Sequence, residues 1–319
     1  MHGVLEGKRI SLSENMMVSI KQNVGRFMER LQFPLEAQVT FLEVLDKIAD
    51  DRDAAQSLLE FVSQYSESEH CDYLAHLAKS KAIGEKLGIH EYTMAMLIFL
   101  CYAEKLRLRY LERGLDEAVY WNSMADISYK LEECRLVHGV VGSFVAPWFI
   151  GFFNLTRFAL GRLQFEIIVA DKEYPVSCRA IQKGDKIINI HIPRTGTRLE
   201  HEQVLEAYRL AEKWFANEFV GRDTLFGCHS WLLYPWHAEA LAPTSNLAAF
   251  MKDFEIVESG QNSDYQEVWR LFDCRYTGDP DALPQDSSLR RRYVERIKSG
   301  KPIGWGFGFF YFQNGEILK

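Results

Sequence analysis

The hydrophobic pattern of this chain changes character near Pro147, and that change defines the folding units we expect. Before Pro147, apolar residues recur every three to four positions, as on the buried face of a helix. After it, apolar and polar residues alternate, as on a strand with one buried face. The length of 319 residues fits about two domains at roughly 150 residues each. We therefore expect a helical domain over residues 1–138 and a mixed α+β domain over residues 139–319.

Two helices stand out in the first half. One begins near Pro34, because proline is favoured in the first turn of a helix. Its apolar row is Leu35, Val39, Leu42, Leu45 and Ile48. The segment after His90 is apolar on most sides, so we expect it to be the central helix of a bundle. Gly88 and Gly114 are predicted C-terminal caps, and residues 116–134 a further helix.

The second half is predicted to hold strands with helices between them. The predicted strands cover residues 156–169, 176–182, 186–193, 225–233, 254–259 and 304–312. The predicted helices cover residues 200–219, 237–241 and 288–298. This order indicates an α+β or mixed α/β sheet with flanking helices rather than a bundle.

Alternation assigns faces to two of these strands. In the first strand, Leu163, Phe165 and Ile167 should point one way, and Arg162, Gln164 and Glu166 the other. In the last strand, Gly304, Gly306 and Gly308 should leave one face bare, so that a neighbour or a ligand can approach closely.

Charge and cysteine usage narrow the class of protein. The formal net charge of −7 argues against nucleic-acid binding by bulk electrostatics, which needs a concentrated positive surface. The six cysteines never form C-x-x-C and fit reduced cytosolic thiols. Residues 139–156 are uncharged but interrupted by Pro147, and the apolar part is too short for a membrane span, so we expect a buried connector. No signal peptide is visible, and we expect a cytoplasmic protein without a membrane or nucleic-acid partner.

Several catalytic motifs are incomplete. His201-Glu202 is not followed by the second histidine of a zinc protease, and no metal site is predicted. Gly300-Lys301 lacks the first glycine of a P-loop, and the alternate glycines near 306 do not fit a dinucleotide-binding fingerprint. Ser230 lacks the glycines of a hydrolase nucleophile elbow.

The segment IHIPRTGTRL contains a candidate anion site. Arg194, Gly196 and Arg198 lie where the chain leaves a strand and enters a helix. The positive end of the helix dipole and exposed backbone N–H groups favour anions there, and arginines add charged donors. The alternative is an ordinary strand–helix turn with solvated arginines.

Three titratable side chains are candidates for proton transfer. His191 and His229 each lie within an apolar strand, and histidine has a pKa suited to proton transfer near neutrality. Glu166 could act as a base, or it could form a structural ion pair on its strand. For both histidines, burial as neutral side chains with a backbone partner remains the alternative.

The segments RFALGRLQFE, INIHIPRTG, CHSWLL and PTSNLAAF resemble a bacterial acyltransferase family. Its members join a helical N-terminal domain to a C-terminal domain similar to the GNAT acyl-CoA N-acyltransferases. The resemblance implies an acyl-CoA co-substrate, acetyl-CoA or a longer one, whose diphosphate is held by the loop after the INIHIP strand. It implies that the acyl thioester lies where two parallel strands splay apart. The implied cofactor-binding residues are Asn189, Ile190, Ile192, Arg194, Thr195, Gly196, Thr197 and Arg198.

The resemblance also implies the reaction: transfer of the acyl group to an amine of a small molecule. The base would be His191, His229 or Glu166, with Ser230 nearby and Tyr234 as the nearest equivalent of the tyrosine that protonates the leaving thiolate. Two alternatives stay open. The protein could bind CoA without catalysis and use its helical half to dock a partner, or it could be a hydrolase using Ser230. The oligomeric state is left open.

Overall fold

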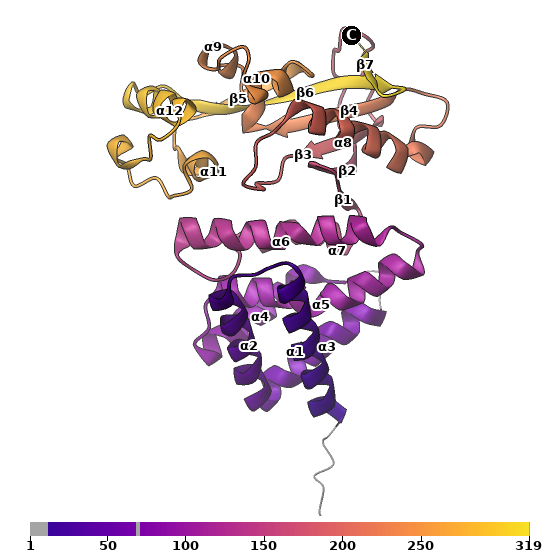
Figure 1. Cartoon of the computed structure of the whole chain (residues 1–319), viewed down its shortest axis with the longest axis vertical. Helices are drawn as coiled ribbons and strands as arrows, with labels where there is room; N and C mark the ends of the chain where they lie inside the picture. Colours follow the sequence, from indigo (N-terminus) through magenta and orange to yellow (C-terminus); the bar gives the residue numbers. More distant parts are fainter. Residues whose placement is uncertain (1–11, 68–70, 319) are drawn as a thin grey trace, which may run out of the picture. The chain divides into compact units, whose positions relative to one another are not determined.

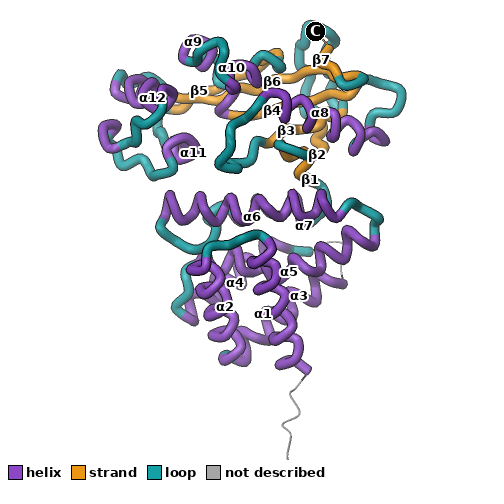
Figure 2. The backbone as a smooth tube through the Cα atoms, in the orientation of Figure 1, coloured by secondary structure: helices purple, strands orange, loops and turns teal. Residues whose placement is uncertain are grey.

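The structure, a computed structural model, describes residues 12–67 and 71–318, which form two compact units. The N-terminal unit contains the chain up to Glu117 together with residues 130–135 and 139–154. The C-terminal unit contains residues 118–129, 136–138 and 155 onward. Helix α6, Glu117–His138, thus supplies residues to both units. Figure 1 labels the elements of each unit, and Figure 2 separates helix, strand and loop.

The N-terminal unit is helical, as predicted. Besides its part of α6, it contains α1 Leu12–Arg30, α2 Leu35–Asp50, α3 Arg52–Glu67, α4 Tyr73–Leu87, α5 Glu91–Glu112 and α7 Ile150–Phe153. Helix α5 packs against α1, α3 and α4 and is buried on most sides, which confirms its central position. Gly88 and Gly114 have φ values of +67° and +63°, so both adopt the left-handed conformation of a helix terminus.

One detail of α2 was predicted wrongly. Leu35 and Val39 are 75% and 45% exposed instead of buried. The buried row is Ala37, Phe41, Val44, Leu45 and Ile48. The large ring of Phe41 lies at the centre of this row, and the helix is therefore rotated away from the predicted face.

The uncharged stretch 139–156, expected to be a buried connector, is buried only in part, because Gly139, Pro147, Asn154 and Thr156 are exposed. It contains the short helices Ala146–Phe149 and Ile150–Phe153, and Phe149, Phe152 and Phe153 are fully buried. Over the described parts of the chain, 12–67 and 71–318, no helix is both long enough and apolar enough to cross a bilayer.

The C-terminal unit is built on a mixed sheet of seven strands (Figure 2). They are β1 Arg157–Leu160, β2 Leu163–Val169, β3 Lys186–His191, β4 Thr224–Ser230, β5 Glu255–Asn262, β6 Ile303–Gln313 and β7 Glu316–Leu318. The spatial order is β1-β2-β3-β4-β6-β5, with β7 paired to β6. Only β3 and β4 pair in parallel among the described strands. The predicted α+β class is confirmed.

Helices connect these strands. They are α8 His201–Trp214, α9 His237–Ala240, α10 Asn246–Met251, α11 Trp269–Phe272 and α12 Ser288–Lys298. The predicted helix 288–298 matches α12 at both ends. At its N-terminus the Ser287 hydroxyl caps the helix by accepting from the N–H of Arg290. Helices α10 and α11 were not predicted.

The first predicted strand is a hairpin instead of one strand. Residues 156–169 form β1 and β2, which are joined by a two-residue turn at Gly161-Arg162 and closed by the pairing of Leu160 with Leu163. Gly161 has a φ of +63°, which glycine adopts without steric cost. Arg162 therefore lies in the turn. The prediction that it shares a strand face with Gln164 and Glu166 is wrong.

Two further strand predictions need correction. Residues 176–182 form a loop, in which Ile181 makes an isolated bridge to Tyr174. Pro175 breaks regular pairing there, since proline lacks a backbone donor. Strand β4 ends at Ser230, and Trp231–Leu233 form a 3₁₀ turn capped by the Ser230 hydroxyl.

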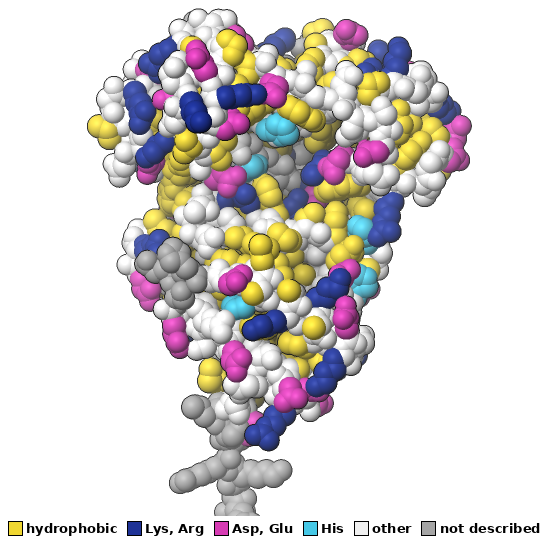
Figure 3. All heavy atoms as spheres, turned by 180° about the vertical axis from the view of Figure 1, so that it is seen from behind, with side chains coloured by type: hydrophobic (Ala, Val, Ile, Leu, Met, Phe, Trp, Pro, Cys, Tyr) yellow, Lys and Arg dark blue, Asp and Glu magenta, His cyan; other side chains and the backbone are white. Residues whose placement is uncertain are grey.

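The two faces of the sheet differ in chemistry. One face is covered by α8, whose Tyr208 ring lies 5.5 Å from Phe226 of β4 and 4.9 Å from Phe310 of β6. The opposite face carries Gln164, which donates a hydrogen bond of 2.7 Å to Asp126 in the part of α6 that belongs to this unit. On the molecular face drawn in Figure 3, basic and acidic side chains are interspersed in each unit.

The alternate glycines of β6 allow close approach of neighbouring chain, as predicted. A Cβ on Gly304 would lie 2.2 Å from the Gly260 carbonyl oxygen, and one on Gly306 would lie 2.2 Å from the Leu233 carbonyl oxygen. On Gly308 it would lie 2.9 Å from the Phe254 side chain. The bare face of β6 is therefore filled by the protein itself.

We predict that Gly306→Ala destabilises the C-terminal unit by about 1–3 kcal/mol, the usual cost of overpacking, because backbone must move to admit the methyl group. The matched control is Gly25→Ala in α1, where an added Cβ meets no atom within 4 Å. This control should be neutral or stabilising by up to about 1 kcal/mol. Chemical denaturation of both variants measures the difference, and equal stabilities would contradict the packing described here.

Candidate functional site

Four polar side chains form a two-by-two array on the sheet face opposite α8. Gln164 and Glu166 come from β2, and Asn189 and His191 come from β3. Antiparallel pairing places Gln164 opposite His191 and Glu166 opposite Asn189. Since alternate residues of a strand share a face, all four side chains point to the same side of the sheet.

Hydrogen bonds to the Glu166 carboxylate link three members of the array. His191 Nε2 lies 2.7 Å from Glu166 Oε1, and Asn189 Nδ2 donates to the same oxygen at 3.5 Å. Contact with a carboxylate makes Nε2 the protonated nitrogen of the neutral imidazole. Nδ1 is then the nitrogen that can accept a proton.

Buried charges surround Glu166. Arg157 of β1 contacts it with an Nη2–Oε2 distance of 2.9 Å, and the two side chains are 10% and 18% exposed. Burial acts to raise the pKa of Glu166, but the hydrogen bond to His191 and the charge and hydrogen bond of Arg157 outweigh it and lower the pKa. Glu166 is therefore ionised at neutral pH.

His191 is neutral at neutral pH. Burial lowers its pKa below the usual 6.5, and the charge of Arg157 acts in the same direction, whereas the hydrogen bond and charge of Glu166 act to raise it. A neutral imidazole oriented by an ionised carboxylate is the form that a general base requires.

Two amide oxygens in the array are buried acceptors without a hydrogen-bond partner among the described residues: Asn189 Oδ1 and Gln164 Oε1. Their orientation follows from their neighbours. The Gln164 nitrogen must face the Asp126 carboxylate, and the Asn189 nitrogen must face the Glu166 carboxylate, since only the N–H₂ group can donate. The array thus offers two acceptor oxygens to a donor group.

The parallel ladder between β3 and β4 ends beside this array. It consists of the pairs Ile188–Phe226 and Asn189–Gly227. Both strands continue beyond it, β3 to His191 and β4 to Ser230, without further described pairs between them. The ladder thus ends on the two strands at which the resemblance implies a splay.

His229 follows the ladder on β4 and is exposed. Its ring lies 4.3 Å from that of Trp305 on β6, and partial desolvation of the imidazole lowers its pKa. It makes no described hydrogen bond to Glu166 or His191. The structure therefore brings His191 and Glu166 together and leaves His229 on the neighbouring strand.

The β3–α8 loop, residues 192–200, follows His191 directly. Gly196 has a φ of +75°, is exposed, and a Cβ there would meet no atom within 4 Å. The Arg162 guanidinium donates to the carbonyl oxygens of Pro193 at 3.2 Å and Thr197 at 3.4 Å. Arg162 thus holds two carbonyl groups of this loop. The open space at Gly196 lies in the segment that leads to the N-terminus of α8, which begins at His201.

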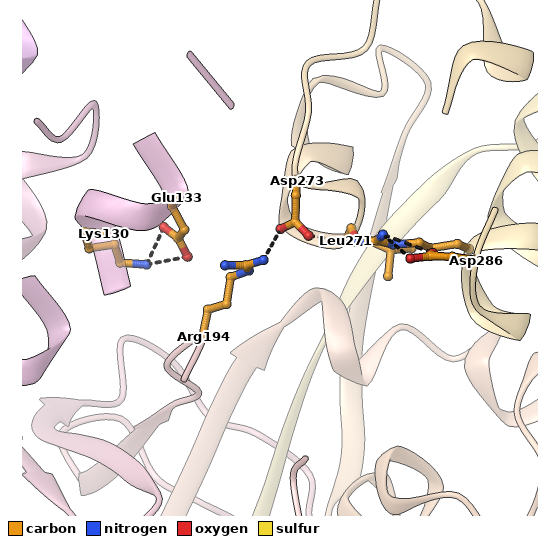
Figure 4. Close-up of polar contacts among 7 residues, drawn as sticks. Lys130, Glu133, Arg194, Leu271, Asp273 and Asp286 are labelled. Carbon is orange, nitrogen blue, oxygen red and sulfur yellow. Dashed lines mark hydrogen bonds and ion pairs between the residues drawn. The ribbon is translucent and has the colours of Figure 1, made fainter. Parts of the chain in front are cut away.

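The other predicted loop residues differ in exposure. Thr195 and Thr197 share a hydroxyl–hydroxyl bond of 2.8 Å, and Arg198 is exposed. Arg194 pairs with Asp273 at 2.8 Å (Figure 4). Ile192, the first residue of the loop, is partly buried.

Three predicted residues have structural contacts outside the array. The Ile190 side chain is 1% exposed and faces the α8 side of the sheet, opposite Phe165. The Ser230 hydroxyl accepts from the N–H of Leu232 at 3.2 Å. Tyr234 is 3% exposed, and its hydroxyl oxygen accepts from Gln261 and Arg296, each at 3.0 Å.

Sequence reasoning missed Arg157, Asp126 and the role of Arg162. A prediction of the Gly161-Arg162 turn would have found Arg157, because a hairpin closed by Leu160 and Leu163 places Arg157 opposite Glu166. Asp126 lies on a different predicted element, and no local signal links it to the array. Among residues 12–67 and 71–318, no group of three or more His, Cys, Asp or Glu side chains is arranged to hold a metal ion.

Two family models match nearly the whole chain. Residues 22–155 match an N-acyltransferase N-terminal domain, and residues 157–310 match a GNAT-like C-terminal domain. The chain belongs to this two-domain acyltransferase family. The resemblance noted in the sequence is thereby confirmed. No protein of curated function matches this sequence.

Solved structures share the fold of this acyltransferase. An acyltransferase in complex with decanoyl-CoA and teicoplanin is 21% identical and has a TM-score of 0.69, with 90% of this chain and 87% of the other covered. An acyltransferase variant in complex with octanoyl-CoA is 19% identical and has a TM-score of 0.70, with 96% of each chain covered. At this level of identity the likeness is one of fold.

The array predicts how the pKa of His191 responds to its neighbour. Glu166→Gln removes a charge and a hydrogen bond that raise this pKa, and it leaves the Arg157 charge that lowers it. We expect the His191 pKa to fall further below 6.5, as measured by NMR titration of labelled histidine. In the control Glu258→Gln, the pKa of His229 should fall, because Glu258 raises it, and that of His191 should stay constant. An unchanged or higher His191 pKa in Glu166→Gln would contradict the assigned contact.

Proposed function

We propose that this acyltransferase moves an acyl group from acyl-CoA to an amine of a small molecule, at the edge where β3 and β4 diverge. The observation that carries the proposal is the end of the parallel ladder at Asn189–Gly227, directly before the β3–α8 loop. The decanoyl-CoA and octanoyl-CoA in the structures of similar fold support acyl-CoA as the donor, and the teicoplanin complex supports a small-molecule acceptor.

The β3–α8 loop has the features that a diphosphate needs. Gly196 leaves its surroundings open, and the first N–H groups of α8 have no acceptor within the helix. Arg194 and Arg198 supply guanidinium groups, which bind phosphate oxygens with charge-assisted hydrogen bonds. We assign the diphosphate of the donor to this loop.

His191 is the proposed general base. An amine attacks a thioester only in its neutral form. As the C–N bond forms and the C–S bond breaks, the nitrogen loses a proton, and CoA leaves as a thiolate that takes up a proton to become the free thiol. His191 accepts the proton from the amine nitrogen, and Glu166 stabilises the resulting imidazolium through its contact with Nε2. The bound donor supplies the thioester, and no covalent intermediate with the protein is needed.

The acceptor amine has partners in the array. Asn189 Oδ1 and Gln164 Oε1 are buried acceptors that an amine N–H can satisfy, which offsets the cost of leaving them unpaired. Both oxygens can only accept, so this part of the array favours an acceptor group that donates hydrogen bonds, as an amine does.

The proposal is tested by release of free thiol from a panel of acyl-CoAs with polyamine, amino-sugar and amino-acid acceptors. His191→Gln retains a side-chain N–H that can donate to Glu166 but cannot accept the proton, and kcat should fall about 10²–10⁴-fold, as for loss of a general base. The control His90→Asn alters an exposed helix-capping histidine of the N-terminal unit and should leave kcat unchanged.

Two outcomes would contradict the proposal. Unchanged turnover in a folded His191→Gln variant would exclude His191 as the base. Tight CoA binding without thiol release for any amine would favour a non-catalytic CoA-binding module, with the helical unit as a docking domain.

A further inference from the structure

The loop arginine Arg194 is engaged by a carboxylate that lies far from it in sequence. Asp273 follows α11, and its Oδ1 lies 2.8 Å from Arg194 Nη2 (Figure 4). The other oxygen of the same carboxylate lies 2.7 Å from Arg290 Nη2 on α12. One carboxylate thus bridges two guanidinium groups of the C-terminal unit.

The two arginines are held unequally. Arg290 is 16% exposed, donates through Nε to the Leu271 carbonyl oxygen at 2.9 Å, and pairs with Asp286 at 3.0 Å. Arg194 is 34% exposed and extends from a loop. If the bridge opens, Arg290 keeps Asp273 in place, and Arg194 is the side chain that can move.

We propose that Asp273 is a positioning residue that lowers the affinity of the β3–α8 loop for the donor diphosphate, because it neutralises Arg194 until the diphosphate takes its place. This inference rests on the proposed function of the loop. If Arg194 bound phosphate oxygens while it was still paired with Asp273, its guanidinium would hold two anions side by side. These two anions would repel each other. Arg194 therefore exchanges the carboxylate for the diphosphate.

The backbone at Asp273 makes the test possible. Asp273 has a φ of +58°, in the left-handed region, and its N–H bonds to the Trp269 carbonyl oxygen at 2.9 Å. Asparagine tolerates this conformation as well as aspartate does, whereas alanine would add strain. Asp273→Asn thus removes the charge and keeps the helix terminus.

The experiment compares the Kd of CoA, measured by calorimetry, in the wild type and in Asp273→Asn. We expect CoA to bind about 2- to 5-fold more tightly in the variant, the range that an exposed ion pair supports. The gain should shrink at high salt, since partly exposed charges are screened. In steady-state assays, KM for acyl-CoA should fall and kcat should stay constant. If Asp273 had only a structural role, its replacement would weaken CoA binding.

Three controls isolate the contact. Asp286→Asn removes the 69%-exposed carboxylate that also pairs with Arg290, and it should leave the CoA affinity unchanged. Pantetheine, which lacks the diphosphate, should bind the wild type and Asp273→Asn equally. In the background of Arg194→Ala, the Asp273→Asn change should no longer tighten CoA binding.

Weaker or unchanged CoA binding by a folded Asp273→Asn variant would overturn the inference, and weaker binding would show that Asp273 instead orients Arg194 for the diphosphate. Failure of the proposed function gives a different pattern. In that case the wild type does not bind CoA, or Arg194→Ala binds CoA as well as the wild type does.

Discussion

The short parallel ladder between β3 and β4 is the constraint on which the rest of the site depends. Two residue pairs, Ile188–Phe226 and Asn189–Gly227, form this ladder. Beyond it the described pairing between the two strands ends, although β3 continues to His191 and β4 to Ser230. Because β3 leads directly into the β3–α8 loop, the end of the ladder and the loop that we propose for the donor diphosphate come from the same stretch of chain.

The electrostatics of the array follow from which charges are buried together. Arg157 compensates Glu166, and the ionised Glu166 in turn fixes the protonated nitrogen of His191. A buried carboxylate without these partners would be costly, and removal of Arg157 or Glu166 leaves the charge of the other uncompensated. The sheet therefore keeps a charged group on a partly buried face and holds a neutral histidine beside it. Fixed geometry of this kind favours proton transfer, since the base does not have to be reoriented during the reaction.

The fold could be predicted from the sequence wherever periodicity and end signals agreed. Helix 288–298 has both an apolar face and a serine cap, and its predicted bounds match α12. Prediction failed where one residue changed the geometry of an apparently regular run. Gly161 turns an alternating segment into a hairpin, and Pro175 precedes a loop that alternation alone made look like a strand.

The site could be predicted only as separate residues. Glu166 and His191 were candidates by type and strand position, and β2–β3 pairing brings them to 2.7 Å. The partners of Gln164 and Arg194 were not predictable, because Asp126 and Asp273 reach these two side chains through packing of distant elements instead of local pattern. A carboxylate on a helix or a loop gives no sequence signal for the side chain it will contact.

Hydrogen–deuterium exchange with and without CoA tests the central claim most directly, because it locates the ligand without reliance on turnover. The account predicts that CoA slows exchange at backbone amides of the β3–α8 loop, the start of α8, and the ends of β3 and β4. Protection confined to other segments, with these amides unchanged at saturating CoA, would contradict it.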